Sequence, residues 1–283
     1  MAASHRMLDD SQLLGATNEG GATMQNQPPL VNRQAVFIYG LICYLIFLAT
    51  FLYAIGFIGN VFVPKSIDSG RSEPLLKALL INAALLSVFA IQHSVMARAW
   101  FKRAWTRMVP EVVERSTYVL LSSLALLLMF WQWRPIGGVI WNVKSVAGQL
   151  LLLGVFWAGW VTVLWSTCLI NHFDLFGLRQ VYLYLQKRPY TSLGFRTPTL
   201  YNYVRHPLYL GWLMVFWGTP VMTVAHLVFA LATTAYMLLA IQLEERDLVK
   251  IHGDEYLKYR RRIPMILPLK WNKSKVDVRT TGV

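Results

Sequence analysis

The chain is poor in acidic residues and in cysteine. Its 283 residues include 14 Asp and Glu against 27 Lys and Arg, and two cysteines, Cys43 and Cys168. Both cysteines lie inside apolar runs, which is typical of small buried side chains and argues against a disulfide framework. The six histidines show no HExxH pattern and no Cys/His spacing of a zinc site, so we expect no metal. A glycine-rich phosphate loop is also missing.

Charge is absent from long stretches of the chain. These runs are Gln34–Pro64, Ala78–Ala97, Ser116–Trp133, Ser145–Arg179, which Asp174 alone interrupts, and Pro207–Leu243. About 20 apolar residues suffice to cross the hydrocarbon core as a helix. Backbone groups in lipid must pair internally, and runs this continuous do not have the alternation of a barrel strand. The sequence therefore predicts an all-α, polytopic integral membrane bundle, with the lipid bilayer as partner.

The two ends of the chain differ from this middle part. Residues 1–33 are rich in Ser, Gly, Asn and Gln, and they lack the apolar segment of a secretory signal. We expect a disordered tail at 1–33 and a short basic tail at 269–283. The membrane domain is expected to span residues 34–268.

The last apolar run, Pro207–Leu243, is too long for one crossing. Its 37 residues would form a helix of about 55 Å, against a hydrocarbon core of about 30 Å. Gly218-Thr219-Pro220 lies inside the run, and proline breaks a helix because it lacks the backbone donor and clashes with the preceding turn. The sequence thus predicts a helical hairpin after four full spans.

Counting basic residues supports the hairpin. With it, 22 of the 27 Lys and Arg fall on one side of the membrane, whereas a single crossing divides them almost evenly. Because loops rich in Lys and Arg stay in the cytoplasm, we expect both termini there, in the bacterial inner membrane. The same rule accounts for the net charge of +13 without a nucleic-acid partner.

Two polar clusters flank the hairpin and meet on the predicted cytoplasmic face. Arg205-His206-Pro207 precedes the run, and Glu244-Glu245 follows it. Each cluster can also be interpreted without a functional role: proline favours a first helical turn, arginine anchors at interfaces, and a carboxylate pair can be solvated. The acids nevertheless face the negative end of a helix dipole, which is unfavourable without a purpose. The loop Asn171–Gln180 and His93 fall on the same face, the loop also being compatible with an interfacial amphipathic segment.

The segments Val204–Gly211 and Glu244–Glu245, with Gly253, Tyr256, Tyr259 and Pro264 after them, resemble the membrane methyltransferases. That superfamily includes the isoprenylcysteine carboxyl methyltransferases, phospholipid N-methyltransferases and NnrU-like proteins. The loop Asn171–Val181 is similar to that of the bacterial membrane-bound methanethiol S-methyltransferases, which make dimethyl sulfide. One departure is Thr199, which stands near a position where relatives commonly have glycine.

The resemblance implies S-adenosylmethionine as cofactor and a small thiol as substrate. It also implies the residues of the cofactor site, which are Leu200, Tyr201, Arg205, His206, Tyr209, Glu244 and Glu245. Carboxylates accept hydrogen bonds from ribose hydroxyls or an amino group, and an arginine pairs with a carboxylate.

Methyl transfer to a thiol needs an acceptor that loses its proton, so a nearby base helps. We expect His172 and His93 as candidate bases, with Asp174 orienting His172. Two alternatives stay open: a membrane methyltransferase acting on an isoprenylcysteine, a lipid or another thiol, and a non-enzymatic NnrU-like membrane protein.

Overall fold

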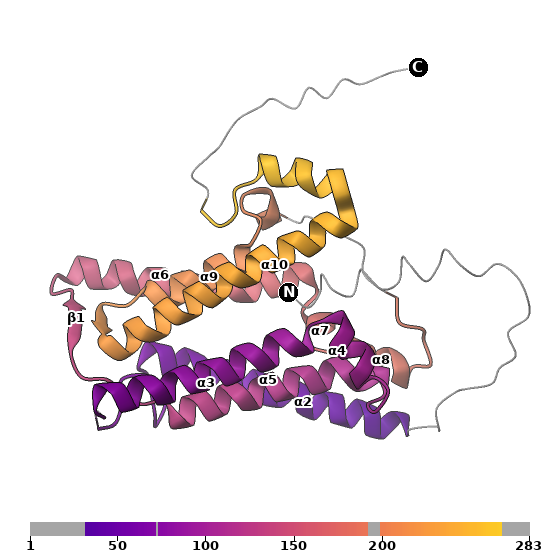
Figure 1. Cartoon of the computed structure of the whole chain (residues 1–283), viewed down its shortest axis with the longest axis horizontal. Helices are drawn as coiled ribbons and strands as arrows, with labels where there is room; N and C mark the ends of the chain where they lie inside the picture. The colour runs from indigo at the N-terminus through magenta and orange to yellow at the C-terminus, as the bar shows by residue number, and fades with distance from the viewer. Residues whose placement is uncertain (1–31, 72, 192–198, 268–283) are drawn as a thin grey trace, which may run out of the picture.

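The computed structural model describes residues 32–71, 73–191 and 199–267, which form a helical bundle (Figure 1). Its elements are α2 (Arg33–Gly59), α3 (Leu75–Met96), α4 (Ala99–Trp105), α5 (Glu111–Gln132), β1 (Val139–Asn142), α6 (Val146–Ile170), α7 (His172–Leu175), α8 (Leu178–Leu185), η1 (Thr199–Asn202), α9 (Pro207–Trp217), β2 (Val221–Thr223) and α10 (Val224–Arg262). Five helices, α2, α3, α5, α6 and α10, are long and apolar enough to cross a membrane. The predicted integral membrane bundle is confirmed. The tails predicted at 1–33 and 269–283 lie outside the described residues, apart from Asn32 and Arg33.

The predicted hairpin is confirmed, but its first leg is only partly helical. α9 ends at Trp217, and α10 begins at Val224 with the Thr223 side chain accepting from the backbone of His226. The 11 residues of α9 give about 16 Å of helix, roughly half of a hydrocarbon core. An extended segment that contains Pro220 continues the leg.

The extended segment satisfies its backbone by pairing with β1, which the sequence pattern did not predict. β1 and β2 form a two-stranded antiparallel sheet. Next to it, the Val143 amide donates to the Pro220 carbonyl (3.0 Å) and the Val224 amide to the Gly138 carbonyl (3.1 Å). Non-helical backbone at membrane depth needs such internal partners. A strand this short shows no alternation that a sequence could reveal.

The bundle has two layers, with α6, α9 and α10 in one and α2, α3 and α5 in the other (Figure 1). Within the first layer, α6 and α9 cross at Gly159 and Gly211. A Cβ added to Gly159 would lie 2.8 Å from the Gly211 carbonyl oxygen, and one added to Gly211 would lie 2.9 Å from that of Gly159. Small residues allow membrane helices this close an approach. The crossing therefore fixes α9 on α6, and with it the turn that precedes α9.

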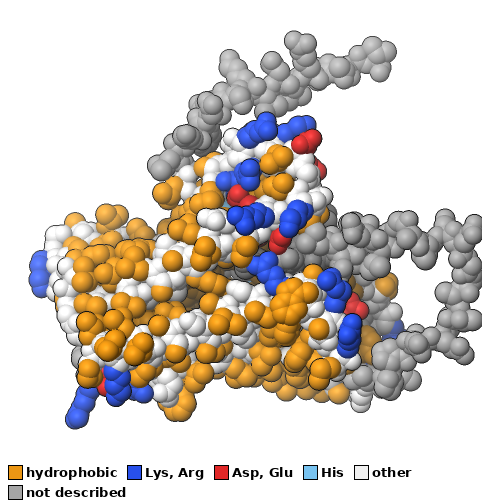
Figure 2. Space-filling model, in the orientation of Figure 1, with side chains coloured by type: hydrophobic (Ala, Val, Ile, Leu, Met, Phe, Trp, Pro, Cys, Tyr) orange, Lys and Arg blue, Asp and Glu red, His pale blue; other side chains and the backbone are white. Residues whose placement is uncertain are grey.

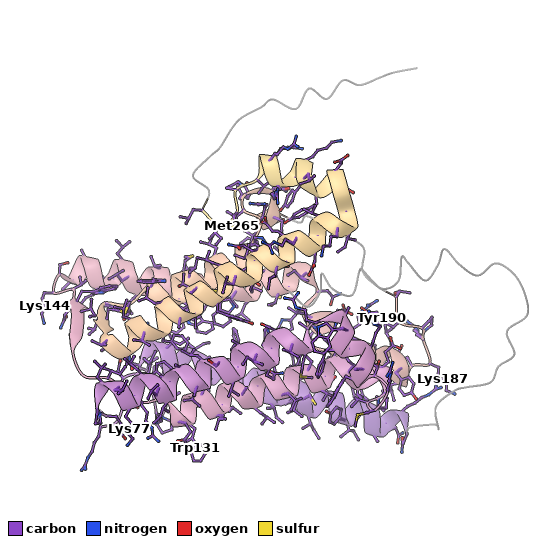
Figure 3. All side chains as sticks on the ribbon, viewed as in Figure 1. Lys77, Trp131, Lys144, Lys187, Tyr190 and Met265 are labelled. Carbon is purple, nitrogen blue, oxygen red and sulfur yellow. The ribbon has the colours of Figure 1, made fainter. Side chains whose placement is uncertain are left out.

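The surface and the loops agree with a membrane location. Hydrophobic side chains cover the bundle, and charged side chains gather at its ends and on the projecting part of α10 (Figure 2). Lys77 and Lys144 lie at one end of the bundle, and Lys187 and Tyr190 lie at the other (Figure 3). The loops therefore group into two ends in the way that the basic-residue count predicted.

Candidate active site

The turn before α9 is held by the segment that follows α10. His206 is the N-cap residue of α9, and Pro207 occupies its first turn. The Arg205 amide donates to the Pro264 carbonyl oxygen (2.9 Å), and the His206 amide donates to that of Met265 (3.1 Å). Met265 lies beside the end of α10 that turns back (Figure 3). Residues about 60 positions apart in the sequence thus form one rigid turn.

Glu245 is the centre of a buried ionic cluster. Its Oε1 atom lies 2.8 Å from Nη1 of Arg205 and 3.1 Å from Nε2 of His206, and Arg260 approaches Oε2 at 4.0 Å. The side chains of Arg205, His206 and Glu245 are 10%, 6% and 11% exposed. Charges removed from water to this degree need such partners. The two clusters that the sequence predicts on one membrane face are thus in direct contact.

Arg205 keeps a donor for a further group. Its Nε atom is buried and finds no hydrogen-bond partner among the residues that the structure describes. An unpaired buried donor costs free energy, so such a group calls for an explanation. The guanidinium geometry suits a carboxylate ligand.

Glu244 faces a different set of groups from Glu245. The Tyr209 hydroxyl donates to Oε2 of Glu244 (3.4 Å). Burial raises the pKa of Tyr201, and the negative charge of Glu244 raises it further. The Tyr201 phenol therefore stays protonated and can donate a hydrogen bond. Its backbone carbonyl accepts from the Tyr259 hydroxyl (2.7 Å), and Leu200 precedes it, half-buried in η1.

A reversal within α10 brings Tyr259 and Arg260 to the site. Gly253 has φ 51° and ψ −125°, so α10 consists of two helices joined at this residue. The second part turns back (Figure 1), which places Tyr259 on Tyr201 and Arg260 near Glu245. A φ of this sign favours glycine. The sequence motif includes Gly253, but its pattern does not predict the turn.

His172 sits in an aromatic cluster beside α2 and α6. Its Nδ1 lies 2.9 Å from the Thr167 hydroxyl, which itself donates to the Leu164 carbonyl (2.7 Å). Thr167 has one hydroxyl proton, so His172 donates from Nδ1 and keeps a lone pair on Nε2. The Tyr44 hydroxyl lies 3.0 Å from that atom. Burial lowers the pKa of His172, which favours the neutral ring.

Asp174 does not orient His172, because both ring nitrogens take other partners. Its carboxylate accepts from Arg179 (3.1 Å), from the Gln180 amide (3.1 Å) and from the Tyr190 hydroxyl (3.2 Å). Asp174 therefore folds the loop between α6 and α8 onto itself. The sequence placed Asp174 two residues from His172, but on a short helix residues so spaced do not face each other.

His93 contacts α5. The Tyr118 hydroxyl lies 2.9 Å from Nδ1 and 3.1 Å from Nε2 of His93, and Ser122 Oγ lies 3.3 Å from Nδ1. Phe89 stacks on the imidazole ring (5.2 Å between centroids). Sequence reasoning missed Tyr118, because one tyrosine in an apolar run gives no signal of its role.

Arg115 is a second polar residue that sequence reasoning did not select. It is 4% exposed, on the second turn of α5. In the sequence it directly precedes the apolar run Ser116–Trp133 and is one of the basic residues expected at the cytoplasmic membrane boundary. A signal existed in the adjacent Glu114-Arg115 pair at the start of an apolar helix, since ionisable residues there are costly. Among the described residues, no three His, Cys, Asp or Glu side chains are grouped as in a metal site.

Comparison with known proteins gives close relatives. The chain is 60% identical over 255 residues to the methanethiol S-methyltransferase of Crocosphaera subtropica, covering 89% of this chain and 100% of the relative. It is 55% identical over 238 residues to the methanethiol S-methyltransferase of Mycobacterium tuberculosis, covering 84% and 98%. Nurim from Xenopus laevis is 32% identical over 59% of this chain and 61% of its own length. No family model and no solved structure matches.

Proposed function

We propose the reaction of this protein from its family, because the chain belongs to the methanethiol S-methyltransferases. The reaction is methylation of methanethiol by S-adenosylmethionine, which gives dimethyl sulfide. S-adenosylmethionine supplies a methyl group on a positively charged sulfur, which leaves as a neutral thioether.

The main support for the proposed cofactor is that Glu244 and Glu245 have separate sets of partners. Glu245 is paired with Arg205 and lies within hydrogen-bonding distance of His206, whereas Glu244 accepts from Tyr209 and lies near Tyr201. The unpartnered Nε donor of Arg205 fits a carboxylate, and Glu244 fits an amino group or ribose hydroxyls. Tyr201, which is near Glu244, and Leu200, which precedes it, are suited to contact the nucleoside. Donors and acceptors for a zwitterionic, hydroxylated molecule are thus all present.

The acceptor thiol has to lose its proton as it takes the methyl group. Neutral imidazole is the side chain whose basicity suits this near pH 7. His93 and His172 remain the candidates, and Asp174 supports the loop that carries His172. The substrate sulfur, the methyl carbon and the leaving sulfur must be nearly collinear, and holding them so lowers the barrier by several kcal/mol.

We further propose that this end of the bundle faces the cytoplasm of a bacterial inner membrane. The support is the basic-residue asymmetry, since 22 of the 27 Lys and Arg belong to this side. Cellular S-adenosylmethionine would then reach the site directly.

A titration of purified protein with S-adenosylmethionine tests the proposal. We expect saturable binding by the wild type, and about 10- to 100-fold weaker binding by Glu244→Gln, because hydrogen bonds to a charged group are worth about 1.5–3 kcal/mol. Glu73→Gln is the matched control: Glu73 pairs with Lys77 (2.8 Å) in the loop before α3, at the opposite end of the bundle. Binding by Glu73→Gln should equal that of the wild type.

Gas analysis above cells supplied with methanethiol tests the acceptor. Cells that express the wild type should release dimethyl sulfide, and cells that express Glu244→Gln should release far less. Absence of cofactor binding by the wild type would reject an enzyme, whereas binding without dimethyl sulfide would point to another acceptor.

A further inference from the structure

We propose that Tyr118 is a catalytic residue on the acceptor side, that its hydroxyl passes the thiol proton to His93, and that buried Arg115 stabilises the thiolate. This inference rests on the proposed function and selects between the two candidate histidines.

Tyr118 is placed to relay a proton. Its side chain is 3% exposed, and its hydroxyl lies within hydrogen-bonding distance of both ring nitrogens of His93. His93 itself is fixed by the stacked ring of Phe89 and by Ser122. A buried phenol that reaches an imidazole edge can accept one proton while it gives up its own.

Arg115 supplies positive charge at the same place. Its guanidinium carbon lies 5.1 Å from the centroid of the Tyr118 ring. Its Nε–H donates to the Leu175 carbonyl (2.7 Å), which orients the group. A fixed cation in a site of low dielectric favours an anion that develops nearby, without the cost of reorganising water.

The loop whose sequence resembles the thiol methyltransferases packs on this same turn of α5. Besides the contact of Leu175 with Arg115, the Ser116 hydroxyl donates to the Gly177 carbonyl (3.4 Å). A Cβ on Gly177 would lie 2.7 Å from the Ser116 nitrogen, so only glycine allows this approach. Phe176 from the loop and Phe47 from α2 pack against the cluster that contains Tyr118. A thiol with one methyl group would therefore meet an aromatic wall and a cation together.

The turn of α3 that carries His93 also contacts α10, which carries the proposed cofactor wall. Tyr236 lies on α10 about two turns before Glu244, the residue that accepts from Tyr209. The Tyr236 hydroxyl of α10 bonds to the hydroxyl of Ser94 (2.9 Å), which is one residue from His93. The Phe89 ring contacts the rings of both His93 and Tyr236. These contacts of Ser94 and Phe89 with Tyr236 thus hold the His93 turn of α3 against the helix that carries Glu244.

His172 touches the same aromatic wall from its other elements, through ring contacts with Phe47 and Phe176. Its hydrogen bonds, however, run to Tyr44 of α2 and to Thr167 of α6. The ring nitrogens of His172 are therefore joined to α2 and α6, whereas those of His93 are joined to Tyr118 and Ser122 of α5.

The proposed step balances as follows. The S–H bond of methanethiol breaks, and its proton moves to the Tyr118 oxygen. The phenolic proton of Tyr118 moves to a ring nitrogen of His93. A lone pair of the thiol sulfur forms the new C–S bond, and the electrons of the breaking bond stay on the sulfur of the methyl donor. His93 releases the extra proton after the products leave.

Turnover with two acceptors tests this step. Tyr118→Phe should bind S-adenosylmethionine as tightly as the wild type but turn over methanethiol about 100-fold more slowly, because a positioned acid–base group contributes about that factor or more. With hydrosulfide in mildly alkaline buffer, an acceptor that is mostly ionised already, the loss should shrink to a few-fold. Arg115→Lys, which keeps the charge but not the Nε contact, should give a smaller loss with both acceptors.

Tyr39→Phe is the matched control. It removes the hydroxyl that bonds to Thr117 (2.9 Å), the residue before Tyr118, and should keep wild-type turnover. If Tyr118→Phe loses turnover equally with both acceptors, Tyr118 has a structural role and the relay is overturned. Wild-type turnover of methanethiol by this variant would overturn the relay as well. If Tyr118→Phe does not fold, wild-type turnover by Arg115→Lys together with a loss of methanethiol turnover in Tyr44→Phe would overturn the proposal in favour of His172. A wild type that binds no cofactor would contradict the proposed function instead.

Discussion

Glu244 and Glu245 are adjacent in the sequence, yet their surroundings give them different roles. Neighbouring residues on a helix point about 100° apart, so Glu245 meets Arg205 and His206 while Glu244 meets Tyr209. Glu245 joins α9 to α10, and its loss would leave the buried Arg205 guanidinium and the His206 ring without their partner. Glu244 keeps the capacity to bind a ligand. The two acids are therefore not interchangeable.

At the residue scale, His172 predicts a pH dependence of stability. Burial lowers its pKa in the folded protein, whereas an unfolded histidine titrates near about 6.5. Below that pH the unfolded chain takes up the proton more readily, so the free energy of unfolding falls as the pH is lowered from about 6.5 toward the folded pKa. His172→Gln should reduce this fall. Thermal unfolding midpoints in detergent at about pH 7.5 and 5.5 measure it, and parallel profiles would contradict the prediction.

At the scale of elements, the site depends on two places where glycine shapes a helix. Gly159 and Gly211 let α6 and α9 cross closely, which positions the Arg205-His206 turn. Gly253 then lets α10 reverse, so that its end returns to that turn. The site is therefore built between elements, and no single helix carries it.

Gly253→Ala should weaken cofactor binding. A side chain at φ 51° and ψ −125° costs about 1–3 kcal/mol, and straightening the helix would withdraw Tyr259 and Arg260. We expect S-adenosylmethionine affinity to fall about tenfold, as measured by titration. Gly154→Ala on α6, where an added Cβ meets nothing within 4 Å, is the control and should bind normally. Equal affinities of the two variants would argue against a role for the reversal.

At the scale of the whole molecule, the bundle has two ends of different character. One end carries the site with the loops around α4, α7 and α8, and the other carries the β1–β2 sheet (Figure 1). At the sheet end, Asp68 bonds to Thr223 and to Asn60 (2.8 Å), which ties the loop after α2 to the start of α10. The sheet end thus holds the layers together, while the proposed site belongs to the opposite end.

Cysteine labelling in bacterial spheroplasts tests how the molecule is oriented. A membrane-impermeant thiol reagent should label Lys77→Cys and Lys144→Cys from outside, and Lys187→Cys only after permeabilisation. All three lysines are exposed, and Cys168→Ser serves as background because Cys168 is the exposed native cysteine. Labelling of Lys187→Cys in sealed spheroplasts would reverse the proposed orientation.

The sequence by itself determined the membrane class, the hairpin and the grouping of loops, because the hydrocarbon thickness and the placement of Lys and Arg constrain them directly. It also named most of the residues around Glu244 and Glu245, since charged groups at a membrane boundary are conspicuous. Only the tertiary structure decided that Asp174 bonds within its own loop, that Gly253 reverses α10, and that Tyr118 reaches His93. These depend on contacts between distant segments and on the direction of side chains, which a local pattern of apolar and charged residues does not encode.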